Sequence, residues 1–352
     1  MMKPGSLKIL YIGPIRRGST TKQRMIALQD LGHKLTKVNT HPEWVVRKEW
    51  RLHNRIIRRL FGPMDLASTN EAIINHLEKE QFDLLWIDKG LTIEPDTFKA
   101  VGSLQDKCLI VGYSPDDMTG NKRNQSRRFL RSLRYYDIYF TTKSYCVSEL
   151  EELGCRRSEF IGNAYDRSSH HPVEVTTEER ERFGGPVGFI GQWEPERAKS
   201  LYFLADCGID VRVWGYTWHR CKRHCERLRL ENRPLLAEDY ARAICAFDIN
   251  LGFLRKANRD LQTTRSMEIP ACGGFMLAER TDEHLSLFKE GKEAEFFSSD
   301  EELLDKVKYY LCHDEERKGI AQAGRQRCLD SGYSNHERLR EAINKIVALR
   351  SK

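Results

Sequence analysis

Asp260 and Glu268 enclose a cluster of hydrogen-bond donors. The two acids are eight positions apart, and Thr263, Thr264 and Arg265 lie between them. If a short helix opens at Thr263, its main-chain N–H groups, the threonine hydroxyls and the guanidinium together suit a diphosphate. Glu268, one turn further on, is placed to accept hydrogen bonds from both hydroxyls of a ribose. The alternative is an ordinary capped helix with an exposed Glu268.

Short apolar segments alternate with helical patterns along most of the chain. The strands expected from this pattern are 7–13, 33–39, 82–88, 108–114, 137–142, 186–193, 209–215, 247–253 and 274–279. Strands that alternate with helices indicate parallel sheets built from right-handed crossovers. Ligands of such sheets bind beyond the carboxyl ends of the strands, so the polar residues at those ends are the candidates for a site.

A turn-rich stretch near residues 162–180 interrupts this alternation, which then restarts. We therefore expect two doubly wound α/β domains in tandem. The predicted boundaries are an N-terminal domain at 1–165, a linker at 166–185, a second domain at 186–333 and a final helix at 334–352.

The composition is that of a globular protein with an excess of positive charge. The chain has 352 residues, 40% of them hydrophobic and 31% charged, and its formal net charge is +7. This length is typical of two domains. No segment approaches the roughly 18 apolar residues of a membrane-spanning helix, and the N-terminal apolar run is too short for a signal peptide. We expect a cytoplasmic protein whose cysteines are reduced thiols.

Two segments, 45–62 and 121–134, carry much of the positive charge. In the first, Ile56, Leu60 and other apolar residues alternate with six arginines and lysines. A basic amphipathic helix suits an anionic membrane surface, such as the inner membrane face, or an acidic partner. The alternative is a solvated helix whose apolar face packs on its own domain. Nucleic acid is not an expected partner, because no helix-turn-helix, zinc-finger or aromatic-basic RNA signature is present.

Three segments resemble the C-terminal domain of GT-B glycosyltransferases: 250–256, 265–279 and 288–311. The resemblance is closest to the CgeB-like branch, also called spore maturation protein B-like, and covers residues 186–340 well. The N-terminal half is similar more loosely, through SPDDM (114–118) and GNAYD (162–166). This resemblance implies two Rossmann-like domains that face each other across a cleft, with the final helix packing back on the first domain.

The resemblance also implies roles for individual residues of the second domain. Retaining GT-B enzymes mark the donor site with two acids separated by seven residues. By this likeness Glu268 binds the ribose, and Asp260 takes the place of the acid that contacts the sugar. Arg197, and after it Lys199, would neutralise the diphosphate leaving group, because a fixed cation stabilises developing negative charge. Arg255 is a rival phosphate contact.

The segment 213–218 follows a predicted strand and ends in aromatic residues. In GT-B folds this region borders the nucleotide base, which implies stacking on Trp214 or Tyr216. A tryptophan in the core is the alternative interpretation for Trp214.

In the first domain, residues 11–20 form a strand and then a glycine-bounded loop that opens a helix. GT-B enzymes often place such a loop over the diphosphate or the acceptor, which implies Gly13 on the donor side and Arg16 on the acceptor side. The loop is not a Walker loop, because the Gly-Lys-Ser/Thr ending is absent.

Asp116 and Asp117 are adjacent carboxylates at the end of the predicted strand 108–114. One of them could act as the general base for an acceptor hydroxyl, or could bind the acceptor. Lys89, at the end of another predicted strand, is placed to pair with one of them on the acceptor side. The alternative is that Asp116 only caps the next helix.

The stretch 218–228 offers four soft metal ligands: His219, Cys221, His224 and Cys225. Their spacing does not suit one closed tetrahedral zinc site, and the stretch is typical of a basic helix. We therefore expect no bound metal and no cofactor.

These observations predict a glycosyltransferase that carries out hexosyl or related transfer without a metal ion. Its partners would be a nucleotide-sugar donor and a glycan, lipid-linked or protein acceptor of cell-surface glycan biosynthesis. The acid pair favours retention, whereas a base at Asp117 would favour inversion. The alternatives are a nucleotide-sugar epimerase with the same donor site, and a non-enzymatic spore or envelope assembly protein on the same fold.

Overall fold

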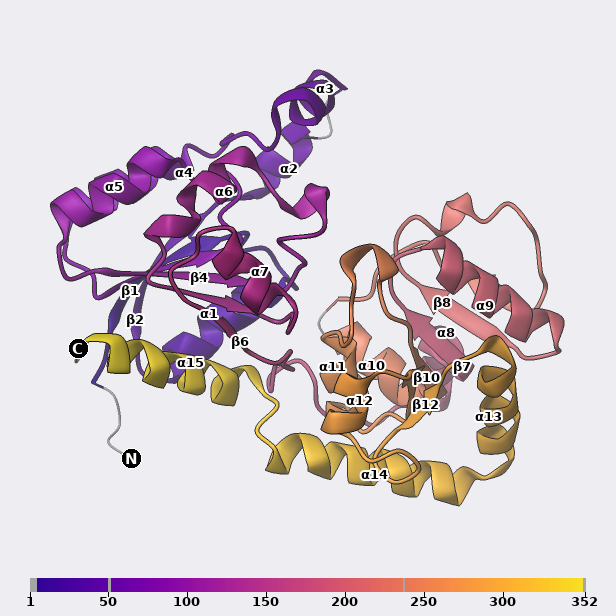
Figure 1. Cartoon of the computed structure of the whole chain (residues 1–352). Coiled ribbons are helices and arrows are strands. Elements are labelled where there is room, and N and C mark those ends of the chain that lie inside the picture. The colour runs from indigo at the N-terminus through magenta and orange to yellow at the C-terminus, as the bar shows by residue number, and fades with distance from the viewer. Residues whose placement is uncertain (1–4, 50–51, 237, 351–352) are drawn as a thin grey trace. The chain divides into compact units, whose positions relative to one another are not determined.

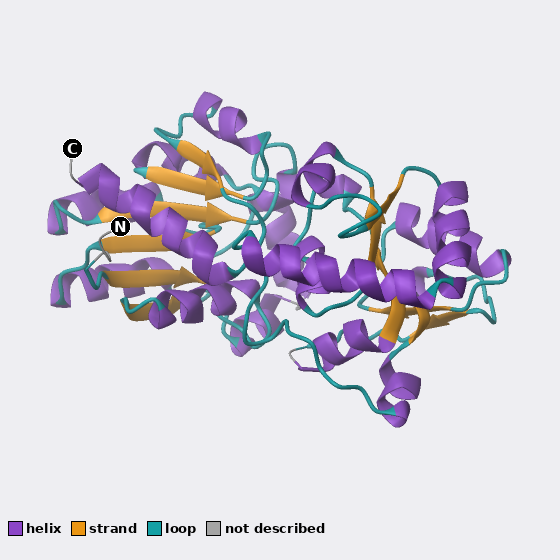
Figure 2. Cartoon of the chain, turned by 90° about the horizontal axis from the view of Figure 1, so that it is seen from below, coloured by secondary structure: helices purple, strands orange, loops and turns teal. Residues whose placement is uncertain are grey.

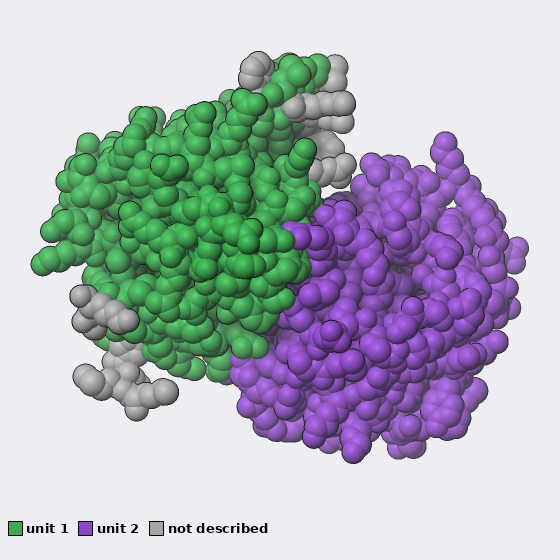
Figure 3. Space-filling model, in the orientation of Figure 1, with its two compact units in different colours: residues 1–162, 335–352 green, residues 163–334 purple. Residues whose placement is uncertain are grey.

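The chain forms two compact units, each built around one parallel sheet. The computed structural model describes three stretches: residues 5–49, 52–236 and 238–350. Unit 1 comprises residues 1–162 and 335–352, and unit 2 comprises residues 163–334 (Figure 3). The predicted α/β class, with two sheets wound on both faces by helices, is confirmed.

Unit 1 contains a six-stranded sheet in the order β2-β1-β3-β4-β5-β6, with all neighbours parallel (Figure 1). The strands are β1 (Lys8–Gly13), β2 (Lys34–Asn39), β3 (Leu84–Asp88), β4 (Leu109–Ser114), β5 (Ile138–Thr141) and β6 (Ser158–Phe160). The helices are α1 (Thr20–Asp30), α2 (Glu43–Glu49), α3 (Leu52–Phe61), α4 (Thr69–Lys79), α5 (Pro95–Leu104), α6 (Arg127–Ser132), α7 (Cys146–Glu152) and α15 (Asn335–Arg350).

The two faces of this sheet bury different sets of side chains, because successive residues of a strand point in opposite directions. Leu10 and Ile12 of β1 pack with the side chains of α4 and α5 on one face. Ile9 and Tyr11 pack with α1 and with the apolar side of α15 on the other face. Figure 2 shows the strands side by side with helices lying along the sheet. The final helix is therefore part of the core of unit 1.

A buried ion pair lies at the carboxyl end of β3. Arg24 of α1 donates to both oxygens of Asp88, at 3.2 Å from Nε and 2.8 Å from Nη2, and both side chains are almost inaccessible to solvent. The Tyr11 hydroxyl donates to the same carboxylate at 2.6 Å. The Arg24 guanidinium also lies 4.2 Å from the ring centre of Tyr113. Every charge in this cluster is thus matched inside the unit.

Unit 2 repeats the architecture with the strand order β12-β11-β10-β7-β8-β9. Its strands are β7 (Gly185–Ile190), β8 (Val211–Trp214), β9 (Leu228–Leu230), β10 (Phe247–Gly252), β11 (Met276–Glu279) and β12 (Glu295–Phe297). Its helices are α8 (Thr177–Phe183), α9 (Pro195–Asp206), α10 (Glu238–Ala246), α11 (Arg265–Ala271), α12 (Asp282–Leu287), α13 (Asp300–Cys312) and α14 (Asp314–Asp330).

The stretch 166–185, which the sequence suggested as a linker, is part of unit 2. It contains α8, which begins with a complete capping box between Thr176 and Glu179. Its last residue is the first residue of β7. The chain crosses between the units at residues 162–163 and again at 334–335, and a bridge between Tyr165 and Ser334 holds these two passages together.

One helical prediction was wrong, and another falls in part on residues that the structure does not describe. In the predicted helix at 45–62, α2 extends to Glu49 and α3 begins at Leu52, and residues 50 and 51 lie outside the described residues. The predicted basic helix at 218–228 is one 3-10 turn followed by irregular chain that leads into β9. In residues 218–228, apolar side chains do not recur at the spacing that would pack one face of a helix against the core. A high content of basic residues alone was therefore not enough to predict a helix.

Breaking the buried pair should destabilise unit 1 strongly. Arg24→Met leaves the Asp88 carboxylate buried with only the Tyr11 hydrogen bond described above. Removing one member of a buried pair typically costs about 3–5 kcal/mol, so we expect a loss of this size in the free energy of unfolding, measured by urea denaturation.

Two controls accompany this measurement. Arg24→Met combined with Asp88→Leu removes both charges and should recover most of the loss. Lys99→Ala removes one member of an exposed pair with Asp96 and should change little. An equally large loss in the double variant would show that side-chain packing, and not the unpaired charge, carries the effect.

Candidate functional site

The predicted site maps to the carboxyl edge of the sheet of unit 2. β7 and β10 are neighbours in the sheet although they are not consecutive in the chain, so the strand order reverses between them. Parallel sheets bind ligands outside the carboxyl ends of their strands at such a reversal. The chain leaves β7 toward α9 and leaves β10 toward α11 at this point.

Arg197, in the first turn of α9, is buried between the two loops that leave these strands. Its Nη1 donates to the main-chain oxygen of Gln192 at 3.0 Å, in the loop after β7. Its Nε and Nη2 donate to the oxygens of Leu254 and Phe253, at 3.2 and 3.5 Å, in the loop after β10. Only 3% of this residue is exposed. Arg197 therefore connects the loop after β7 with the loop after β10 through its hydrogen bonds.

Arg265 is the first residue of α11, and its guanidinium group lies near that of Arg197. Its Nη2 donates to the same Phe253 oxygen at 3.4 Å, and both guanidinium carbons lie over the ring of Phe189, at 5.5 Å for Arg197 and 5.8 Å for Arg265. The Nε of Arg265 is buried and has no hydrogen-bond partner in the structure. Arg265 thus has donor capacity that the fold does not use.

The electrostatics of this pair favour an anion. Burial, and then the neighbouring Arg265 guanidinium, lower the pKa of Arg197 to about 10, while Glu194 and Asp260 act in the opposite direction. At neutral pH Arg197 remains charged. The positive charges of Arg197 and Arg265 therefore lie close together in a partly buried site. A bound anion would reduce the repulsion between them.

The other predicted cations are already paired. Arg255 Nε lies 2.7 Å from Glu194 Oε1, beside the same loop, and remains close to Arg197. Lys199 lies 3.4 Å from Asp300 Oδ2, and 81% of its side chain is exposed. The structure therefore groups Arg255 with Arg197 and Arg265 and leaves Lys199 on the outer surface of α9.

Asp260 and the threonines lie in the loop before α11. Asp260 Oδ1 accepts a hydrogen bond from Asn258 at 2.8 Å, and its charge is close enough to act on Arg197. The Thr263 N–H donates to Ser266 Oγ at 3.1 Å, and Thr264 immediately precedes the helix without a side-chain cap. The Thr263 N–H is therefore occupied by Ser266, and α11 is short. Fewer main-chain N–H groups than predicted are available here to bind a diphosphate.

Glu268 is buried in the first turn of α11, with 7% of the residue exposed. Tyr240 of α10 donates its hydroxyl to Oε2 at 2.6 Å, and His170 Nε2 lies 3.8 Å from Oε1. The alternative of an exposed Glu268 is therefore wrong. The sequence pointed to Glu268 but missed Tyr240 and His170, because no spacing pattern connects them with it.

Trp214 belongs to the core. It is fully buried, its Nε1 donates to the Phe183 oxygen at 2.9 Å, and the guanidinium groups of Arg212 and Arg233 flank its ring at 4.8 and 4.7 Å. Its expected role in stacking on a base is therefore wrong, because no face of the ring is open. Tyr216, two residues later, is 55% exposed.

The predicted residues at the end of β1 in unit 1 have different surroundings. A Cβ atom at Gly13 would come within 2.8 Å of side-chain atoms of Asp88 and Thr21, so glycine is required there for packing. Arg16 is exposed in the loop that follows.

The acidic pair after β4 divides into an outer and an inner carboxylate. Asp116 forms an ion pair with Lys89. Asp117 is fully buried, and its Oδ1 accepts hydrogen bonds from the N–H groups of Thr119 and Gly120, at 3.1 and 2.8 Å. This geometry gives Asp117 the role of a turn cap, so the capping function considered for Asp116 falls to its neighbour.

Possible metal-ligating atoms also meet near Asp117. Its carboxylate lies with Cys146 and Glu149, and their ligand atoms are within 4.8 Å of one another. Among the described residues, His219, Cys221, His224 and Cys225 form no such group.

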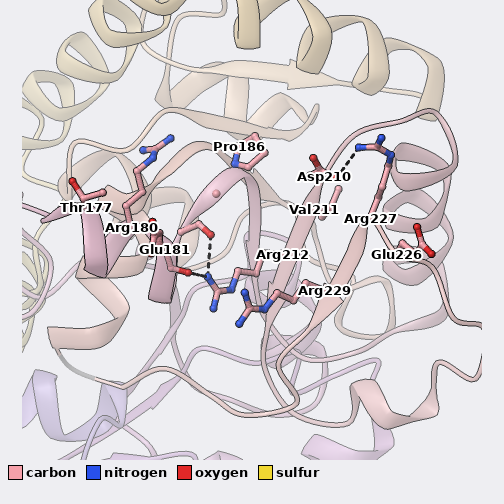
Figure 4. A pocket seen from close by; sticks show the side chains of 12 residues that line it. Thr177, Arg180, Glu181, Pro186, Asp210, Val211, Arg212, Glu226, Arg227 and Arg229 are labelled. Atoms are coloured by element: carbon pink, nitrogen blue, oxygen red, sulfur yellow. Dashed lines mark hydrogen bonds and ion pairs between the residues drawn. The ribbon is translucent and has the colours of Figure 1, made fainter.

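A cavity of about 460 Å³ in unit 2 opens beside the first residues of β7 and β8, at the amino edge of the sheet (Figure 4). Four arginines line it: Arg180, Arg212, Arg227 and Arg229. Their ion-pair partners are Asp248, Glu231, Asp210 and again Glu231. Because the strands end at the other edge of the sheet, this cavity is distinct from the predicted donor site.

Part of the chain matches a known protein family. Residues 197–344, which include Arg197, Arg265 and Glu268, match a family described as glycosyl transferase-like. No curated protein matches the chain in sequence.

Several solved structures share the fold. HepE of Anabaena, in complex with UDP and glucose, has a TM-score of 0.63 and 10% identity, with 97% of this chain and 100% of that chain covered. Sucrose-phosphate synthase of Thermosynechococcus elongatus has a TM-score of 0.66 and 10% identity, with 98% and 100% covered. A glycosyltransferase of Rickettsia africae has a TM-score of 0.66 and 11% identity, with 99% of each chain covered. The fold is that of GT-B glycosyltransferases.

The structural role of Trp214 can be tested directly. Trp214→Phe removes the only N–H that the side chain offers to the Phe183 oxygen and leaves a small cavity. We expect a loss of about 1–3 kcal/mol in the free energy of unfolding, measured by urea denaturation. Tyr216→Ala, at the exposed neighbour, should leave stability nearly unchanged. A stable Trp214→Phe variant would contradict the core assignment.

Proposed function

We propose that this protein is a glycosyltransferase whose donor, a nucleotide sugar, is bound by unit 2. The observation that carries the proposal is the convergence of the Arg197 and Arg265 guanidinium groups on the Phe253 oxygen at the strand-order reversal. The match of residues 197–344 to a glycosyl transferase-like family supports it. The presence of UDP in the HepE structures is consistent with a nucleoside diphosphate as the anion.

The chemistry follows from the charges at this place. When the bond from the sugar to the diphosphate breaks, negative charge develops on the departing phosphate oxygen. A guanidinium held in a partly dehydrated site stabilises that charge without moving. Arg265 offers its unpaired Nε for this contact, and Arg197 adds a second positive charge behind it. We propose that these two groups supply the required positive charge, so that the reaction uses no metal ion.

We further propose roles for the two acids. Glu268 binds the ribose hydroxyls, and Asp260, near Arg197, contacts the transferred sugar. The spacing of these acids favours retention of the anomeric configuration. A base at Asp117 would instead favour inversion, and Asp117 is buried in this structure. Asp116, paired with Lys89, stays a proposed acceptor contact together with Arg16.

The acceptor is proposed to be a glycan, a lipid-linked sugar or a protein, and the cytoplasm is the proposed location. Membership of the CgeB-like branch is likewise a proposal that rests on the motifs of residues 250–311. Of the alternatives, a nucleotide-sugar epimerase would consume the donor without an acceptor product. A non-enzymatic assembly protein would not respond to nucleotide.

Helices α2 and α3 support a peripheral membrane contact. Ile56 and Leu60 of α3 are 51% and 69% exposed, and Trp44 of α2 is 48% exposed. Figure 1 shows α3 projecting beyond the rest of unit 1. The side chains of Arg47 and Arg58 are exposed in the same two helices. Apolar side chains beside cations suit the interface of an anionic bilayer, so the expected packing of this apolar face on its own domain is wrong for Ile56 and Leu60.

In the described part of the chain, every helix is too short or too polar to span a bilayer.

Nucleotide binding is the first test of the proposed function. A nucleoside diphosphate present at 100 times its Kd raises the free energy of unfolding by about 2.7 kcal/mol, which is visible in a thermal shift. UDP, GDP, ADP, CDP and TDP should be compared on the wild type, and we expect one of them to stabilise it. Arg265→Ala should weaken that binding by about tenfold or more, because a charge-assisted hydrogen bond is lost.

Lys199→Ala is the matched control, since Lys199 is a cation of the same region that points to Asp300. It should bind like the wild type. If no diphosphate stabilises the wild type, the donor-site proposal fails and the non-enzymatic alternative gains. If the donor is consumed and only an altered nucleotide sugar forms, the epimerase alternative is correct.

The membrane contact predicts binding to vesicles of phosphatidylcholine with phosphatidylglycerol, but not to phosphatidylcholine alone, in a sedimentation assay. Ile56→Asp combined with Leu60→Asp should reduce binding by about tenfold or more, because two exposed apolar side chains are lost and two negative charges are added. Leu153→Asp changes an exposed leucine elsewhere in unit 1 and should bind normally. Equal binding by all three proteins would refute the contact.

A further inference from the structure

The carboxylate of Glu268 is held on both sides by residues from other parts of unit 2. Tyr240 of α10 donates to Oε2 at 2.6 Å. His170, in the segment where the chain enters unit 2, places Nε2 3.8 Å from Oε1. The rings of His170 and Tyr240 meet edge to face with centres 5.5 Å apart. A carboxylate buried to this extent needs donors. Tyr240 is a donor at hydrogen-bond distance, and the His170 ring lies beside the other oxygen, just beyond that distance.

The hydrogen bonds of His170 define which of its nitrogens carries the proton. The N–H of Asp166 donates to Nδ1 at 3.0 Å, so Nδ1 acts as an acceptor and the proton lies on Nε2. The N–H of His170 in turn donates to the Asp166 oxygen at 2.8 Å. The Ser168 hydroxyl donates to the Asp166 carboxylate at 2.6 Å. This closed turn presents an N–H group toward Glu268.

Tyr240 is also fixed as a donor. Burial, and then the negative charge of Glu268, raise the pKa of Tyr240 well above its usual range. Its hydroxyl therefore keeps its proton at neutral pH and can donate it to the Glu268 carboxylate.

We propose that Tyr240 and His170 are positioning residues that aim Glu268 at a ribose, so that the donor site selects ribonucleotides over 2′-deoxyribonucleotides. This inference rests on the proposed function and adds a specificity to it. A carboxylate has about four lone-pair positions. Tyr240 occupies one and His170 flanks another, and the positions that remain can accept two neighbouring hydroxyls.

The loss of one ribose hydroxyl would leave a buried position of a charged group without a partner. Such mismatches are penalised far more strongly than a missing apolar contact. The fixed orientation matters because a freely rotating carboxylate could turn its oxygens toward the single hydroxyl that remains and recover part of the lost interaction. Removing either positioning residue should therefore lower discrimination and not only affinity.

The test is a ratio of two dissociation constants. UDP, GDP, ADP and CDP are each compared with their 2′-deoxy forms by calorimetry, and the ratio is taken for the nucleotide that binds. We expect the wild type to prefer the ribose form by about tenfold or more. Tyr240→Phe should reduce this preference severalfold. His170→Phe should reduce it as well, and His170→Gln, which restores an N–H near the position of Nε2, should recover part of it.

Tyr309→Phe is the matched control, because Tyr309 donates to Glu316 at 2.9 Å on the exposed surface of the same unit. It should leave both constants unchanged. If Tyr240→Phe weakens ribose and deoxyribose forms equally, the residue is only structural and the inference is overturned. If Tyr240→Phe does not fold, His170→Phe and His170→Gln test the inference in the same way, through the ratio of the ribose and deoxyribose dissociation constants. If no nucleotide binds the wild type, the proposed function itself fails, and this is seen before any variant is made.

Discussion

Two guanidinium groups share one main-chain oxygen at the carboxyl edge of the sheet of unit 2. Because Arg197 donates to Gln192, Phe253 and Leu254, it fixes the course of the loops after β7 and β10 relative to each other. That arrangement defines where Arg265 can lie, and through α11 it also places Glu268. The carbonyl oxygens satisfy the hydrogen bonds of the buried Arg197 guanidinium, but they do not neutralise its positive charge. The contacts that fix the two loops therefore leave a positive electrostatic potential at this place.

The buried arginines at the carboxyl edges of the two sheets have different partners. In unit 1, Arg24 meets the carboxylate of Asp88, with Tyr11 and Tyr113 around the pair, and the cluster is complete without a ligand. In unit 2, Arg197 meets a second arginine. Since both sheets have the same design, this contrast in charge indicates which carboxyl edge is suited to an anion.

The sequence was most informative where a pattern repeats and least informative where distant residues meet. Alternating apolar segments located most central strands, but β6, β9 and β12 are three-residue edge strands too short to produce a period. The acid and arginine types around 260–268 pointed to a region where the structure brings Arg265 close to Arg197. The exposure of those residues was not predictable, because burial of Arg197 and Glu268 depends on loops that come together only in the folded unit. The contacts of Tyr240 and His170 with Glu268 could not be predicted either, because these residues are far from Glu268 in the sequence.

The insertion of unit 2 between β6 and α15 has a consequence for synthesis. The core of unit 1 includes Leu339, Ile343 and Ile346 of α15, which are made after all of residues 163–334. At roughly 5–20 residues per second, the ribosome needs on the order of ten to thirty seconds to produce that insertion. During this interval the face of the unit 1 sheet that α15 later covers is incomplete, whereas unit 2 can already fold. Unit 1 thus begins to be translated before unit 2 but is completed after it, and the exposed apolar face of its unfinished sheet is where a chaperone would be needed.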